Sequence, residues 1–130
     1  MFSIHSKAQV SVEFIVLIGL AFLIAISFVV ASLNQLIEFR NQQESDAVKD
    51  LALKLQQELL LASVVEEGYV RNFDIPTQIE NNDYFLTLEN STVSVQSRNA
   101  YYLVSVPSVV GNFTKGNNKI NKTGGVIYIN

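Results

Sequence analysis

The sequence contains no cysteine and only one histidine, His5, among its 130 residues. The absence of cysteine excludes a disulfide framework and thiolate metal sites, so any folded region must be held together by packing. A lone histidine without a nearby partner ligand is more often an ordinary polar residue than a catalytic base or a metal ligand. We therefore expect a protein that is not an enzyme and that has no metal, no cofactor and no catalytic residues.

Positive charge is also scarce. Nine Lys and Arg residues stand against twelve Asp and Glu residues, which gives a formal net charge of −3. An acidic chain has no electrostatic attraction for a phosphate backbone, so we expect no binding to nucleic acid.

Glycine and proline are both absent between Gly19 and Gly68. Over the second part of this stretch apolar residues recur at helical spacing, which predicts a helix that is half in water and half against an apolar surface. Gly68 fits a left-handed C-terminal cap. The pattern predicts one helix from about Ser11 to Glu67. The members of its apolar stripe are Leu36, Ala47, Val48, Leu51, Leu55, Leu59 and Ala62.

The first part of the same stretch is apolar on all sides. Residues 14–33 carry no charge, and a helix of about 20 apolar residues matches the ~30 Å hydrocarbon core of a bilayer. Such a segment is a cleaved secretory signal, a signal anchor, or a processed helix that later packs into an assembly. Lys7 places the positive charge on the N-terminal side, which predicts that everything after Leu33 lies outside the cell.

The eight residues KAQVSVEF, positions 7–14, precede this apolar run directly. They resemble the processing site of archaeal type IV pilin precursors, which carry a class III signal peptide. In that family a short basic leader ends in Lys or Arg and a small residue, and Gln-x-Ser-x-Glu-Phe and a long apolar helix follow. The resemblance covers residues 1–33, a quarter of the chain.

The resemblance implies a cut between Ala8 and Gln9 by a pilin-type (prepilin) membrane peptidase that recognises Lys7 and Ala8. It also implies that the mature chain is a filament subunit, so that Glu13 and Phe14 belong to the assembly segment. Physical reasoning alone leaves a second role open for Glu13. The carboxylate can stay at headgroup level, where it favours the positive end of the helix dipole.

After Gly68 the sequence changes to short alternating runs with turn residues. These runs predict a small antiparallel sheet of four or five strands, including a tight hairpin at Asn90-Ser91, packed on the helix stripe. The fold class is therefore α+β, a long N-terminal helix with a C-terminal β head. The predicted segments are a cleaved leader (1–8), an apolar transmembrane or filament-core helix (9–33), its amphipathic continuation (34–67) and the head (68–130).

Three sequons for N-glycosylation begin at Asn90, Asn112 and Asn121. All three are predicted to lie in turns of the head, outside the cell. Two stretches that contain carboxylates are weaker candidates for functional sites. Residues 80–83 offer oxygen ligands for calcium but read better as a polar turn, and Glu66-Glu67 reads as a solvated helix end.

The resemblance therefore implies a structural subunit of an archaeal type IV pilus-like filament that exposes its head for adhesion. Its partners would be identical or related pilins, the prepilin peptidase, the pilus assembly machinery and, before assembly, the membrane. The alternative is a single-pass, signal-anchored surface protein whose β head binds a ligand.

Overall fold

A computed structural model describes residues 3–130, without the side chains of residues 3–6. The side chain of the lone His5 therefore lies outside the described part. The chain divides into two compact units, residues 1–39 and residues 40–130. We describe each unit by itself.

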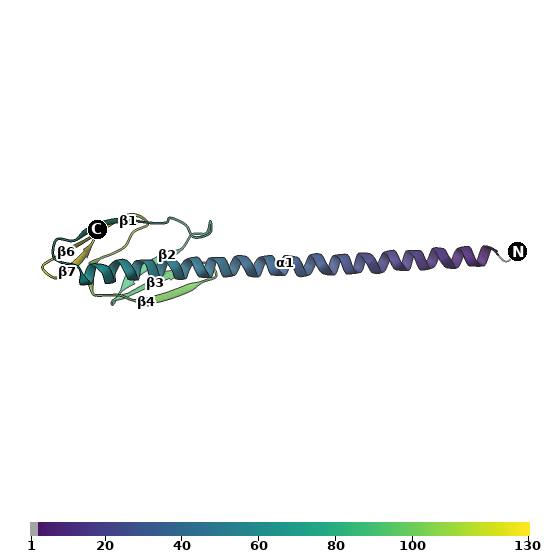
Figure 1. Ribbon diagram of the computed structural model, residues 1–130, viewed down its shortest axis with the longest axis horizontal. Helices are drawn as coiled ribbons and strands as arrows, with labels where there is room; N and C mark the ends of the chain where they lie inside the picture. Colours follow the sequence, from purple (N-terminus) through teal and green to yellow (C-terminus); the bar gives the residue numbers. More distant parts are fainter. Residues whose placement is uncertain (1–2) are drawn as a thin grey trace. The chain divides into compact units, whose positions relative to one another are not determined.

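Helix α1 (Ser3–Val64) supplies all of the described first unit and the beginning of the second. The prediction of one long helix followed by a small β region is confirmed (Figure 1). The helix begins eight residues before the expected start at Ser11, because residues 3–10 contain neither glycine nor proline to stop it. It ends at Val64, three residues before the expected end.

The predicted left-handed cap at Gly68 is only half right. Gly68 does have a positive φ of 84°, but it lies four residues beyond the helix, and its N–H donates to the carbonyl of Lys122. The end of α1 is instead satisfied by a side chain. Lys122 Nζ donates to the carbonyls of Ser63 and Val65, at 3.0 and 2.7 Å. A cation at this position also interacts favourably with the helix dipole.

The head contains seven strands in two sheets, where the sequence predicted one sheet of four or five strands. The first sheet has the order β1-β6-β7-β5 and is antiparallel except for the parallel pair β5–β7. The second sheet has the order β2-β3-β4 and is fully antiparallel. The strands are β1 (Val70–Ile75), β2 (Phe85–Glu89), β3 (Thr92–Gln96), β4 (Tyr101–Ser105), β5 (Val109–Gly111), β6 (Gly116–Thr123) and β7 (Val126–Ile129).

The predicted hairpin at Asn90-Ser91 is confirmed. β2 and β3 pair in register from Phe85 with Gln96 to Glu89 with Thr92. Asn90 and Ser91 have φ values of 49° and 59°, so both central residues are left-handed. Such a turn matches the twist of the two strands that it joins.

The core of the second unit lies between α1 and the two sheets. The part of the predicted stripe from Ala47 to Ala62 supplies the helix side, and Leu55, Leu59 and Ala62 are completely buried. The prediction was wrong for Leu36, which is 47% exposed and lies in the other unit, where no sheet covers the helix.

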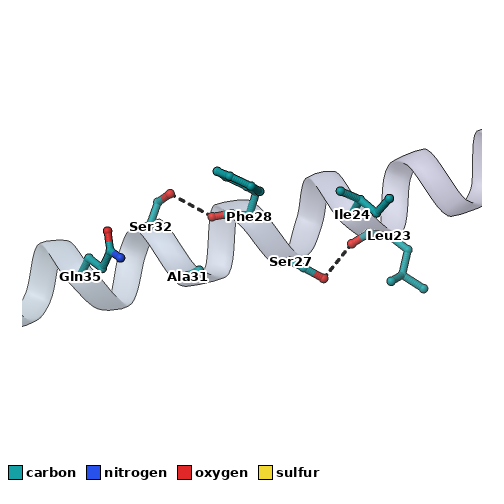
Figure 2. Close-up of a pocket in the computed structure, with 7 residues that line it drawn as sticks. All are labelled: Leu23, Ile24, Ser27, Phe28, Ala31, Ser32 and Gln35. Carbon is teal, nitrogen blue, oxygen red and sulfur yellow. Dashed lines mark hydrogen bonds between the residues drawn. The ribbon is translucent and has the colours of Figure 1, made fainter.

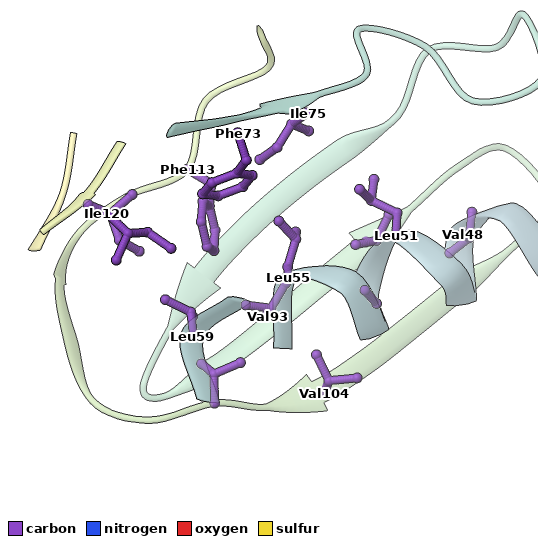
Figure 3. Packing of buried hydrophobic residues seen from close by; sticks show 14 of the residues in the cluster. Val48, Leu51, Leu55, Leu59, Phe73, Ile75, Val93, Val104, Phe113 and Ile120 are labelled. Atoms are coloured by element: carbon purple, nitrogen blue, oxygen red, sulfur yellow. The ribbon is translucent and has the colours of Figure 1, made fainter. Parts of the chain in front are cut away.

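Figure 3 shows Leu55 and Leu59 in one cluster with side chains from both sheets. Phe73 of β1, Ile120 of β6 and Phe113, which precedes β6, come from the first sheet and its loop, and Val93 of β3 and Val104 of β4 come from the second sheet. Burial of each leucine stabilises the fold by about 1.5–3 kcal/mol, so the helix stripe holds both sheets.

Candidate functional site

The residues predicted for processing lie on α1. Ala8 and Gln9, between which the cut is predicted, are both helical and exposed, as is Lys7. No turn or loop marks the predicted cut site.

Glu13 and Phe14 lie one helical turn further on, and both are exposed. Gln9 Nε2 approaches Glu13 Oε1 at 3.5 Å, across the i, i+4 spacing of the helix. Phe14 is 63% exposed. The carboxylate therefore sits on an open helix surface beside the residue that becomes the N-terminus if the predicted cut occurs.

The apolar run, residues 14–33, has no apolar partner in its own unit. Every one of its residues is exposed, and its most apolar part reaches a mean hydropathy of 3.0 with none of it buried. Within residues 3–130, α1 is the one helix that is long and apolar enough to cross a membrane. This surface is compatible with a membrane anchor or a signal.

A hollow of about 380 Å³ interrupts this surface near its C-terminal end. Small side chains, Ser27, Ala31 and Ser32, line it together with larger ones such as Leu23 and Phe28 (Figure 2). The hydroxyls of Ser27 and Ser32 donate back to the carbonyls of Leu23 and Phe28 at 2.8 and 2.9 Å. Because both hydroxyls are satisfied within the helix, they do not need water. The hollow allows another helix to approach closely.

The three sequons differ in their surroundings, and one prediction is wrong. Asn90 is exposed at the tip of the β2–β3 hairpin. Asn112 is exposed between β5 and β6, although Phe113 in the middle of its sequon is buried. Asn121 does not lie in a turn. It is half-buried inside β6, which pairs with β1 on one side and with β7 on the other. Pairing with Val70 of β1 and with Tyr128 of β7 holds Asn121 in the strand.

Glu44 is a buried carboxylate that the sequence did not single out. It is 3% exposed, and its Oε2 accepts a hydrogen bond from Asn99 Nδ2 at 3.1 Å. Its Oε1 and the hydroxyl of the buried Ser97 form no hydrogen bond in this geometry, but the hydroxyl can rotate to donate to the carboxylate. The Ser97 hydroxyl is the main reason that the pKa of Glu44 is lowered. Burial opposes this effect, whereas Asn99 and the charge of Arg98 support it.

Glu44 also lines a polar cavity of about 550 Å³. The cavity lies between residues 40–44 of α1, where the second unit begins, and two turns of the head. The turn at residues 80–82 forms one wall, and Asn99 lies on another. The prediction of a polar turn here is confirmed, because Ile79 and Asn82 form a bridge around two left-handed residues, Glu80 and Asn81.

Asp83, next to this turn, is directed elsewhere. Its carboxylate forms an ion pair with Lys115, and that contact is the main reason that its pKa is lowered. Lys115 Nζ also lies 4.4 Å from the ring centre of Tyr84. The Tyr84 hydroxyl donates to the carbonyl of Pro76, and burial, followed by the charge of Asp83, raises the pKa of Tyr84 to about 12.

Two further carboxylates fasten the head to the end of α1. Glu58 is buried and pairs with Arg71 of β1 at 2.9 Å. Glu67, which was predicted to be a solvated helix end, accepts the N–H groups of Gly124 and Gly125 in the β6–β7 turn, at 2.7 and 2.5 Å. Sequence spacing does not reveal these contacts, because their partners lie far away in the chain.

Across the described residues, no group of three or more His, Cys, Asp or Glu side chains is placed to hold a metal ion. The chain matches no protein-family model, no curated protein and no solved structure. The candidate site is therefore defined by the chain's own residues, namely the exposed segment 7–14, the apolar run 14–33 and the surface of the head.

Proposed function

We propose that this chain is the precursor of a structural subunit of an archaeal type IV pilus-like filament. The observation that carries the proposal is the motif at residues 7–14, placed directly before an apolar helix surface that has no partner in its own unit. A plain signal anchor has no need of Gln-x-Ser-x-Glu-Phe at this position. The separately folded β head supports the same proposal, because it keeps its own core without using the apolar run.

The proposed life of the chain has two stages. The precursor lies in the cytoplasmic membrane with its leader inside the cell, and a prepilin peptidase cuts between Ala8 and Gln9. The mature chain then leaves the lipid and joins identical or related subunits in an extracellular filament, with the help of the assembly machinery. Its head faces outward for adhesion or surface contact.

Glu13 has a specific task in this scheme. After the cut, the backbone nitrogen of Gln9 becomes a free ammonium group one helical turn before Glu13. A lone carboxylate is costly inside an apolar bundle, but a neighbouring subunit's ammonium offsets much of that cost. The pair forms in only one stagger of the helices. It therefore sets the register, while the apolar run supplies packing that is not specific.

The experiment compares Glu13→Gln with Glu38→Gln, which removes another exposed carboxylate from the same helix. Native chains are read from their N-terminus, and filaments are counted by electron microscopy. We expect both variants to be cut before Gln9, and only Glu13→Gln to assemble slowly. A loss of about 1.4 kcal/mol per contact lowers the association constant about tenfold. Normal assembly of Glu13→Gln would disprove the pairing role.

The alternative, a signal-anchored surface protein with a ligand-binding head, is favoured by the 550 Å³ polar cavity of the head. The same experiment separates the two functions. A native chain that still begins at Met1, or one that remains in the membrane fraction without forming filaments, would favour the anchor.

A further inference from the structure

The outer face of the sheet β2-β3-β4 carries three large, exposed apolar or aromatic side chains among polar ones. Phe85, Tyr101 and Leu103 are 75%, 58% and 51% exposed. Strand pairing places Leu103 in one row with Ser94 and Thr87, and Tyr101 in the next row with Gln96 and Phe85.

This face also carries a shallow hollow of about 280 Å³. Its lining is mixed. Thr87, Thr92 and Ser94 contribute hydroxyl groups and Glu89 a carboxylate. Tyr101 and Leu103 contribute a ring and an aliphatic side chain. Hydroxyls and an exposed ring are the groups that a sugar requires, since a pyranose has hydroxyls at its rim and C–H bonds on its faces. The volume lies just below the ~300–1,000 Å³ of pockets for drug-sized ligands.

Asn90, the first residue of a sequon, lines the same hollow. Thr92, the last residue of that sequon, lies in the sheet row at the hairpin end. At ~3.4 Å per residue along a strand, the Leu103 row lies about 7 Å from the Thr92 row and the Tyr101 row about 14 Å away. The first few sugars attached to Asn90 can therefore reach both side chains.

The other two sequons are less suited to modification of the folded chain. A transferase must bind all three residues of a sequon, and at Asn90 the following Ser91 is exposed as well. At Asn112, Oδ1 accepts the N–H of the buried Phe113 at 2.9 Å. At Asn121, the next residue is the Lys122 that holds the end of α1.

We infer that Asn90 is the glycan acceptor of this chain and that the attached glycan lies on the outer face of β2-β3-β4, over Leu103 and Tyr101. In the transfer, Asn90 Nδ2 attacks the anomeric carbon of a lipid-linked oligosaccharide. The N–C bond forms, the bond from that carbon to the phosphate oxygen breaks, the amide loses one proton, and the lipid phosphate leaves with the electron pair. The glycan then covers the exposed ring of Tyr101 and the side chain of Leu103.

This inference rests on the proposed location of the head outside the cell, but not on filament assembly. It is tested first by mass spectrometry of the full chain, expressed in a host that carries a membrane oligosaccharyl transferase. We expect sugar on Asn90. Asn90→Asp, which tolerates the left-handed turn, should abolish it, as should Thr92→Val, and Asn121→Asp should leave the mass of the glycan unchanged. Absence of sugar at Asn90, or sugar on Asn112 or Asn121, would overturn the inference.

The position of the glycan is tested by tyrosine nitration of the detergent-solubilised monomer, in which no neighbouring copy can cover the face. Tyr101 should react several-fold more slowly in the glycosylated chain than in Asn90→Asp, while Tyr128, which is 42% exposed on the other sheet, should react equally in both. Equal reactivity of Tyr101 would show that the glycan leaves the face open. Wild-type filaments whose subunits carry no sugar would refute this inference and leave the proposed function intact.

Discussion

Replacement of Leu55 by alanine tests whether the helix stripe really holds the head. Leu55 is completely buried and lies in the cluster that α1 shares with both sheets (Figure 3). The substitution removes apolar contacts and leaves a cavity that the two sheets can close only in part. Leucine-to-alanine changes at such positions cost about 2–5 kcal/mol.

Leu60 provides the matched control, because it is the same residue type in the same helix but is 47% exposed. Leu60→Ala should cost less than about 1 kcal/mol, since surface substitutions usually change stability by about 0.5 kcal/mol. Both substitutions keep a strong helix former, so helix propensity does not separate them. The difference between the variants therefore measures burial.

Urea unfolding of the full chain in detergent gives the readout. The chain has five tyrosines and no tryptophan, so near-UV circular dichroism reports on tyrosine packing in the head, where all five are located. At an m-value of ~1.5 kcal/mol/M, the expected cost lowers the midpoint by about 1–3 M for Leu55→Ala. Equal midpoints for Leu55→Ala and Leu60→Ala would refute the proposed packing of the head on the stripe.

Three further predictions use the same unfolding assay. Gly111→Ala should destabilise the head more than Gly124→Ala, because both have a positive φ but only the Gly111 Cβ would come within 2.1 Å of the carbonyl oxygen of Ile129; equal losses would contradict this. Glu44→Gln should cost about 1–3 kcal/mol at neutral pH. Folding lowers the pKa of Glu44 from 4.5. The stability difference between the wild-type chain and Glu44→Gln should therefore be complete above pH 4.5 and disappear as the pH falls through the folded-state pKa. A stability difference that does not change with pH would contradict this prediction. Lys122→Met should lower stability by about 1–2 kcal/mol and speed hydrogen exchange at the C-terminal end of α1, because the last carbonyls lose their donor; unchanged exchange there would rule out the capping role.

The sequence was most informative where one physical rule acts alone. The absence of glycine and proline predicted α1, and the 3.6-residue spacing of Leu51, Leu55 and Leu59 predicted the buried face. The β2–β3 hairpin followed from two alternating runs around a two-residue turn. Each of these features depends on residues that are close together in the chain.

Features that depend on distant residues were missed. β5 has only three residues and pairs in parallel with β7, so it lacks both the length and the neighbouring turn that mark a hairpin strand. Within β6, the run Asn117 to Asn121 is mostly polar, and only the buried Ile120 and Asn118 reveal its inner face. For the same reason the sequence placed Asn121 in a turn. It did not reveal that Glu44 and Lys122 satisfy polar groups of distant segments.

The surface of α1 changes character along its length, and this change bears on what the chain does. From Val48 to Ala62 the apolar residues form a stripe, and the residues of the same chain bury it. From residue 14 to residue 33 there is no stripe, because apolar side chains cover the whole circumference and all of them are exposed. No continuous apolar surface of this extent is stable in water. Within its own unit this part has no apolar partner, and lipid or other apolar helices are surroundings that can satisfy every side of it at once. In the proposed filament, the segment would pass from lipid to a bundle of apolar helices and keep its apolar contacts throughout. Because such contacts are not specific, a single charged residue, the proposed role of Glu13, would be needed to make one position in the assembly better than the rest.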